Sequence, residues 1–394
     1  MSETSRREFL AGAAKLAGVS AAAGVAGSAP AVALGAVRGQ PRTVVIETPA
    51  NAIVETSTGK VRGFVRNGIH TFKGIPYGAT TAGDGRFLPP APVAPWTQVR
   101  ATMSYGPVCP QPVRAGWASD RLAFLFDWDD GYPGEDCLRL NVWTPGANAR
   151  SKRPVMVWLH GGGYEAGSSQ ELPSYDGENL SRRGDVVVVS VNHRLNVFGF
   201  LNMAAGGGEQ YSSSVNVGML DIVAALQWVR DNAERFGGDP ANVTVFGQSG
   251  GGAKVSTLMA MPAAKGLFHK AIVQSGSQLR LATAEASAEQ AAAVLKELQA
   301  QGIGSDQLKK VPAARLVEIA TGVKNKLVST KPRAPTHERL GWQPWLDGTI
   351  LTAHPFDPQA PALAAQVPML IGTTVHEFGS LGSAAPDPRA LTRE

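Results

Sequence analysis

The segment that decides the fold is VTVFGQSGGGAKV, residues 243–255. It begins as a short apolar run, typical of a buried strand, and continues into a helix-like stretch. Between them lies GQSGG, residues 247–251, a G-x-S-x-G pattern. Glycines on both sides of the serine allow a strained backbone and close packing of the strand against the helix. This context indicates that Ser249 is a nucleophile, and a simple glycine-rich turn is the alternative.

A second glycine-rich segment, LHGGGYEAGSS at 159–169, follows another apolar run. Its three consecutive glycines allow several backbone N–H groups to face one point, as the stabilisation of an oxyanion requires. We expect Gly162 and Gly163 to be two such donors. Gly250, the residue after the serine, would supply the third N–H group. A phosphate-binding or flexible loop is the alternative for the glycine run taken alone.

Apolar runs and helical patterns alternate along the chain. The helical pattern lies at 219–236, where Ile222, Leu226 and Val229 recur at spacings of three and four. Short Val- and Ile-rich runs typical of parallel strands buried on both faces lie at 155–160, 185–191, 243–247, 270–276 and 368–374. This order predicts an α/β fold. Residues 284–321 predict two further helices, arranged as an inserted cap.

Composition narrows the class of protein. The chain has 394 residues, of which 43% are hydrophobic and 18% charged, as in a folded globular protein. Its net charge is only +5 and it has no run of Lys or Arg, so we expect no nucleic-acid partner. Two cysteines, Cys109 and Cys137, are too few for a disulfide-dense scaffold or a four-cysteine zinc site. Their spacing suggests one bridge, with two buried free thiols as the alternative.

Residues 1–33 have the features of an export signal. Arg6-Arg7 precedes Phe9-Leu10, an Ala/Gly-rich stretch and two small-residue cleavage sites at 29–33. This order predicts a twin-arginine signal read by the twin-arginine export machinery, and a periplasmic or secreted bacterial protein. The stretch is too rich in Ala and Gly for a membrane span, and no cysteine follows it, so we expect no membrane anchor. A disordered or Ala-rich helical N-terminus is the alternative.

From about residue 52 to 380 the chain resembles the type-B carboxylesterases, the cholinesterase-like branch of the α/β-hydrolases. The motifs that carry the resemblance are TGKVRGF (58–64), FKGIPYG (72–78), RFLPPAPVAPW (86–96), GEDCLRLNVWTP (134–145), LHGGGYEAGSS (159–169), VSVNHRLNVFGFL (189–201), residues 216–252, FHKAIVQSGS (268–277) and WLDGTIL (345–351). The resemblance implies one domain over 44–394 with a large, mostly parallel central sheet, flanking helices and helical cap insertions. It also implies hydrolysis of small-molecule esters without a metal or organic cofactor.

The same resemblance assigns further residues. It implies catalysis by Ser, His and Glu, and a disulfide between Cys137 and an upstream cysteine, which here is Cys109. The acid would be Glu377, in IGTTVHEFGSLG at 371–382. His376 stands where the family usually has an aspartate, and an exposed loop carboxylate is the alternative for Glu377.

The catalytic histidine is expected after the acid in the chain order of this fold. The seven histidines are His70, His160, His193, His269, His337, His354 and His376. None of them follows Glu377, and each is expected to have a structural or surface role. We therefore expect the sequence to lack the C-terminal part of the domain that holds the base. Alone, it should be nearly inactive and poorly stable, whereas the full product should be an esterase.

Two features bear on the substrate. Aromatic residues gather between the two cysteines, where they form either a pocket wall or ordinary packing: Trp117, Phe124, Phe126, Trp128 and Tyr132. Gln248 stands where many relatives have glutamate, so neutral esters are favoured over cationic ones. The alternatives to an esterase are a catalytically inactive esterase-like binding protein, and an amide or carbamate hydrolase on the same fold.

Overall fold

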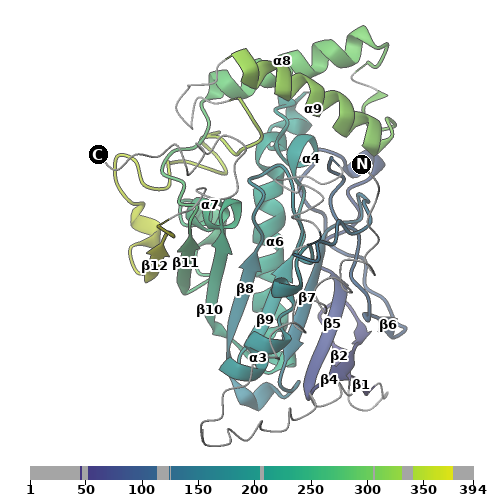
Figure 1. Ribbon diagram of the computed structural model, residues 1–394, viewed down its shortest axis with the longest axis vertical. Helices are drawn as coiled ribbons and strands as arrows, with labels where there is room; N and C mark the ends of the chain where they lie inside the picture. The colour runs from purple at the N-terminus through teal and green to yellow at the C-terminus, as the bar shows by residue number, and fades with distance from the viewer. Residues whose placement is uncertain are drawn as a thin grey trace, which may run out of the picture. The chain divides into compact units, whose positions relative to one another are not determined.

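Nine strands form one mixed sheet in the computed structural model, which describes residues 45–46, 52–112, 124, 126–204, 208–304, 307–330 and 340–375 (Figure 1). Across the sheet the strands are β1 (Val45–Ile46), β4 (Phe64–Arg66), β5 (Ile69–Pro76), β7 (Arg139–Thr144), β9 (Val187–Val191), β8 (Arg153–Leu159), β10 (Gly238–Gln248), β11 (Lys270–Gln274) and β12 (Met369–Gly372). The strands from β9 to β12 in this order are parallel, and the others pair antiparallel. The predicted α/β fold is confirmed, and the five apolar runs form its parallel part.

A smaller sheet and a set of helices complete the described structure. The small sheet contains β2 (Ile53–Glu55), β3 (Lys60–Arg62) and β6 (Arg100–Ala101). The α-helices are α3 (Glu178–Gly184), α4 (Asn196–Phe200), α6 (Val217–Asn232), α7 (Gly250–Leu258), α8 (Ala284–Ala300) and α9 (Ala313–Thr330). Short 3₁₀ turns lie at Gly83–Gly85, Ala149–Ser151, Pro173–Tyr175, Glu209–Tyr211, Ser214–Asn216, Ala233–Phe236, Pro262–Ala264 and Ala362–Ala364.

Helix α6 matches the helix predicted at 219–236. Ile222, Leu226 and Val229 of its periodic stripe are buried in the main core. The helix continues as the 3₁₀ turn at Ala233–Phe236 and ends at Gly237, whose φ of +78° is readily accessible to glycine. The sequence therefore predicts both the buried face of this helix and its end.

The two predicted cap helices are present with shifted bounds. α8 begins after Thr283, whose hydroxyl accepts a hydrogen bond from the Ala286 amide at 3.2 Å. α9 begins after Pro312 instead of at residue 305, because proline lacks the amide hydrogen of a helix interior and fits best at a helix start. Figure 1 shows α8 and α9 side by side beyond α4, and both contribute buried apolar residues to the main core.

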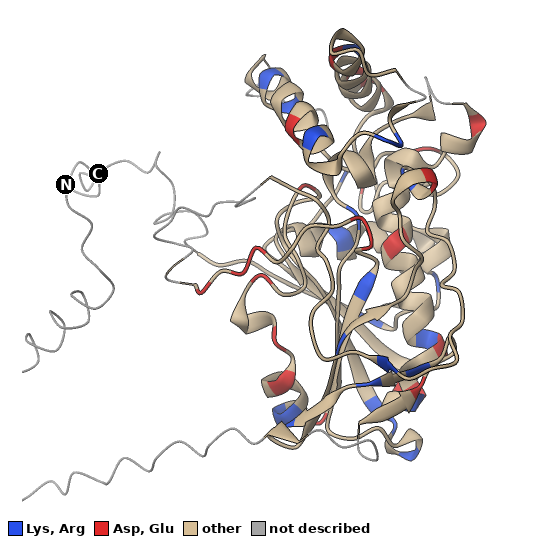
Figure 2. Cartoon of the chain, turned by 90° about the vertical axis from the view of Figure 1, so that its right-hand side faces the viewer, with Lys and Arg blue, Asp and Glu red and all other residues tan. Residues whose placement is uncertain are grey.

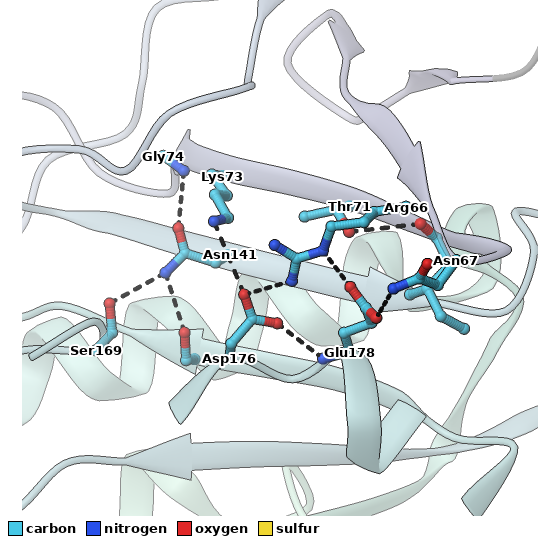
Figure 3. Close-up of polar contacts among 11 residues, drawn as sticks. Arg66, Asn67, Thr71, Lys73, Gly74, Asn141, Ser169, Asp176 and Glu178 are labelled. Carbon is cyan, nitrogen blue, oxygen red and sulfur yellow. Dashed lines mark hydrogen bonds and ion pairs between the residues drawn. The ribbon is translucent and has the colours of Figure 1, made fainter. Parts of the chain in front are cut away.

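A polar network holds the segment before α3 against the sheet (Figure 3). Asn141 of β7 accepts a hydrogen bond from the Gly74 amide at 2.9 Å and donates to the hydroxyls of Ser169 and Ser190, each at 3.0 Å. Arg66 forms ion pairs with Asp176 and Glu178. The chain that leaves β8 through the glycine loop is thus fixed again before it enters α3.

The predicted disulfide is not found in the structure. Cys109 and Cys137 are both free and buried. The neighbouring Cys109 thiol and burial together raise the pKa of Cys137 well above its usual value. The sulfur of Cys109 also accepts a hydrogen bond from the Leu195 amide at 3.2 Å. The two cysteines are thus packed in the core as free thiols.

Acidic and basic residues are interspersed along the chain as drawn in Figure 2. Among the described residues, no helix combines the length and the apolar composition that a bilayer span requires. The N-terminal residues of the predicted export signal lie outside the described residues.

A buried ion pair joins α6 to the end of the parallel sheet. Arg194, which follows β9, and Asp221 of α6 are 1% and 0% exposed. Their side chains form two hydrogen bonds, of 2.7 and 2.8 Å, and the Arg194 amide donates a third at 3.0 Å. Arg194 also donates to the Leu88 carbonyl at 2.7 Å. Because each charge has several partners, removing one of them leaves the other buried without compensation.

We therefore expect Asp221→Asn to lower the free energy of unfolding by about 3 kcal/mol, because the Arg194 charge would stay buried. Asp231→Asn on the same helix is the matched control, since its pair with Arg230 is half exposed and exposed pairs contribute about 0 to 1 kcal/mol. Urea denaturation of both variants measures the difference. Equal losses would contradict a structural role for the buried pair.

Candidate active site

Ser249 lies at the sharp junction between β10 and α7. Its φ and ψ are +54° and −122°, a conformation that residues other than glycine rarely adopt. Such a backbone costs on the order of 1 to 3 kcal/mol and persists only where its surroundings enforce it. Here the Ser249 amide donates to the Gln274 carbonyl at 2.8 Å, and the Ser249 carbonyl accepts from the Ala253 amide at 3.1 Å. The predicted strand, strained serine and helix are all present.

Glycines make this junction possible, because a Cβ atom at several positions would collide with neighbouring backbone. A Cβ on Gly251 would lie 2.0 Å from the Leu159 carbonyl oxygen, and one on Gly276 would lie 1.8 Å from the Ser249 carbonyl oxygen. Gly276 was not among the predicted site residues, although its position just after the strand next to β10 was an available signal. The serine turn is therefore enclosed by backbone on two sides.

The glycine loop that follows β8 packs directly against the serine turn. A Cβ on Gly250 would lie 2.3 Å from the amide nitrogen of Gly163, and one on Gly161 would lie 3.6 Å from the Ser249 Cβ. Gly162 and Gly163 have φ values of +81° and +64°. The structure thus brings Gly163 and Gly250 into contact beside Ser249, with Gly162 in the same loop. Their roles as oxyanion donors stay predictions.

Two histidines lie buried next to this loop. The rings of His160 and His193 stack, with centroids 5.0 Å apart and planes inclined by 18°. Burial lowers the pKa of both imidazoles well below the usual value, so both are neutral. The Nδ1 atom of His160 bonds to the Gly161 carbonyl at 2.9 Å, and that of His193 bonds to the Arg194 carbonyl at 2.8 Å. These rings pack beneath the loop, as expected for structural histidines.

The other described histidines also occupy structural positions. His70 lies in β5, opposite Val65 and Thr144 of the neighbouring strands. His269 accepts a hydrogen bond from the Val243 amide, and His354 accepts one from the Leu281 amide, each at 3.1 Å. His337, His376 and the predicted acid Glu377 lie outside the described residues. The described part of the chain therefore places the serine and the glycine loop, but not the predicted acid.

Three of the aromatic residues between the cysteines that the structure describes are exposed. Phe124, Phe126 and Tyr132 are 63%, 39% and 56% exposed, which disagrees with ordinary core packing. Trp128 lines a surface groove together with Tyr105 and Gln170. Trp117 lies outside the described residues. Gln248, next to the serine, is exposed and presents a neutral amide there.

Comparison with known proteins places this geometry in a family. Residues 50–392 match the family described as the carboxylesterase family. Over 325 residues the chain is 42% identical to the para-nitrobenzyl esterase of Bacillus subtilis, covering 82% of this chain and 63% of that protein. Over 274 residues it is 40% identical to the phenmedipham hydrolase of Pseudarthrobacter oxydans, covering 69% of this chain and 52% of that protein. The chain thus spans only about half to three-fifths of these two relatives' lengths.

Solved structures agree with the sequence comparison. The carboxylesterase of Geobacillus stearothermophilus matches with a TM-score of 0.71 and 39% identity, over 83% of this chain and 62% of that one. An esterase from Clostridium hathewayi matches with a TM-score of 0.75 and 37% identity, over 89% of this chain and 67% of that one. With its strained serine and adjacent glycine loop, this chain belongs to the carboxylesterase family and has the α/β-hydrolase fold.

Proposed function

We propose that the protein hydrolyses carboxylic esters through an acyl-enzyme formed on Ser249. The observation that carries this proposal is the contact between the glycine loop and the serine turn, where Gly250 and Gly163 touch beside Ser249. An ester carbonyl at this point can meet a nucleophile and backbone N–H donors together, which is the arrangement that acyl transfer requires. The identities of 42% and 39% with esterases support the same chemistry.

In the proposed reaction the Ser249 oxygen attacks the ester carbonyl carbon while its proton passes to a histidine. The carbonyl oxygen becomes an oxyanion, held by the amides of Gly162, Gly163 and Gly250. The intermediate then collapses, the C–O bond to the alcohol breaks, and the histidine returns the proton to the departing alcohol. Water repeats these steps on the acyl-serine and releases the acid. Glu377 would orient the histidine and stabilise its protonated form.

Neutral esters are the proposed substrates, because Gln248 places an uncharged amide next to Ser249. A carbamate is the second candidate, since the chain is 40% identical to a protein named phenmedipham hydrolase. The strained serine argues against a binding protein without catalytic activity. Such a protein gains nothing from a backbone that costs on the order of 1 to 3 kcal/mol.

Replacing Ser249 by alanine tests the nucleophile. We expect the full-length gene product to hydrolyse p-nitrophenyl acetate, and Ser249→Ala to reduce kcat by about three orders of magnitude or more. The fold should be retained, because alanine removes only the hydroxyl. Ser329→Ala on α9 is the matched control and should leave kcat unchanged. Turnover by Ser249→Ala at the wild-type rate, with the same thermal unfolding, would refute the assignment.

We also propose export through the twin-arginine pathway, on the sequence of residues 1–33 alone. Changing Arg6 and Arg7 to lysine should keep the precursor in the cytoplasm, because that machinery reads the arginine pair. Immunoblots of cytoplasmic and periplasmic fractions measure the distribution. Unchanged mature protein in the periplasm would indicate another export route.

A further inference from the structure

A lysine is completely buried in the helix that carries the serine. Lys254 lies in the second turn of α7 and has no exposed surface. Its ammonium nitrogen donates a hydrogen bond to the His160 carbonyl oxygen at 2.9 Å. A buried cation is costly unless it is paired, so breaking this hydrogen bond would leave the Lys254 charge without a partner. The bond therefore resists movement of the His160 carbonyl. The His160 carbonyl belongs to the peptide that joins β8 to the glycine loop.

A buried carboxyl group, that of Glu171 after the glycine loop, interacts electrostatically with the same lysine. Glu171 is 5% exposed and accepts a hydrogen bond from the Ser168 amide at 3.2 Å. Its charge attracts that of Lys254. Lys254 therefore connects α7 to the start of the glycine loop through a hydrogen bond. Its electrostatic interaction with Glu171 connects α7 to the segment that follows the loop.

The ionisation of these groups follows from burial. Burial lowers the pKa of Lys254 to about 7, although Glu171 opposes the change. Burial raises the pKa of Glu171 to about 7, although Lys254 opposes it, while Asp130 raises it further. The Lys254 charge also helps to keep the facing rings of His160 and His193 neutral. The pair thus changes its protonation near neutral pH.

We propose that Lys254 is a positioning residue that holds the glycine loop at 161–163 in register with Ser249 and Gly250. The inference rests on the proposed function, in which this loop binds the oxyanion. Glycine backbones have more conformational freedom than any others, so a triple-glycine loop needs an anchor from outside itself. Donors of an oxyanion hole must be held within about 0.5 Å of their working positions. Lys254 supplies that anchor from the same helix that begins at the serine.

The kinetic test removes the anchor, and its double variant does so without leaving a lone buried charge. The variants are Lys254→Met, Glu171→Gln and the double variant, made in the full-length gene product. We expect Lys254→Met and the double variant to lower kcat for p-nitrophenyl acetate by about 10- to 100-fold, with KM changed less than about threefold. The urea concentration at the midpoint of unfolding should be at least as high for the double variant as for the single Lys254→Met variant. Lys265→Met, an exposed lysine beyond α7, is the matched control.

Stability and turnover separate the two possible roles of Lys254. If Lys254 positions the loop, the double variant recovers stability but not kcat. If the double variant regains both, the lysine is only structural and the proposal is overturned. If the wild-type protein shows no more turnover than Ser249→Ala, the proposed function fails, and the positioning of the loop is decided by hydrogen exchange.

Hydrogen exchange measures the stability of the glycine loop independently of catalysis. The amides of Glu165 and Ala166 donate to the Gly162 carbonyl at 3.2 and 3.1 Å and so report whether the loop is formed. We expect them to exchange about 10-fold faster in the double variant than in the wild type or in Lys265→Met. Equal exchange rates in all three proteins would overturn the proposal.

The pH dependence of unfolding tests the ionisation of the pair. Between about pH 7 and 10.5 the unfolded chain holds a proton on Lys254 that the folded protein has lost, so the free energy of unfolding rises with pH. Between about pH 4.5 and 7 the folded protein holds a proton on Glu171 that the unfolded chain has lost, so in this range the free energy of unfolding falls with rising pH. Relative to the double variant, wild-type stability should therefore pass through a minimum near pH 7. A pH-independent difference would contradict the burial-driven pKa shifts of the two groups, whereas the positioning role is decided by kcat and hydrogen exchange.

Discussion

The close approach of two backbones determines the rest of this structure. The first turn of α7 and the end of β8 lie so near each other that a Cβ on Gly251 would stand 2.0 Å from the Leu159 carbonyl oxygen. Only glycine is compatible with such a contact. Because the contact brings the serine turn against the glycine loop, its geometry determines where an attacked carbonyl and its oxyanion could lie.

The surrounding fold maintains this contact from several directions. Parallel pairing places Gly247 of β10 next to Leu159 of β8. The segments that follow these two strands therefore leave the sheet side by side. The Asn141 network fixes the chain that leaves the glycine loop, and the buried pair of Arg194 and Asp221 joins α6 to the end of β9. The serine turn and the glycine loop are therefore held by side chains from distant parts of the sequence, in both the parallel and the antiparallel parts of the sheet.

Local patterns in the sequence predicted the elements that depend on local chemistry. The serine turn, the amphipathic α6 and its end at Gly237 follow from glycine placement and apolar spacing. The polar contacts between distant segments, such as that of Lys254 with His160, could not be predicted, because a lysine within a helix pattern is normally exposed. Pro312 was a local signal for the start of α9, but the predicted helix began seven residues before it. The cysteine spacing predicted the proximity of the two thiols, but the structure holds them unbonded.

The strain at Ser249 has a consequence for how this sequence evolves. Glycine is the residue best suited to a φ of +54° and ψ of −122°, so the backbone at this position favours a residue that has no hydroxyl. Under the proposed function, selection for stability and selection for chemistry therefore act in opposite directions here. In a lineage released from selection for turnover, genetic drift toward glycine at this position would carry no folding penalty. Under the proposed function, the serine at this position is retained for its hydroxyl, against the preference of the backbone.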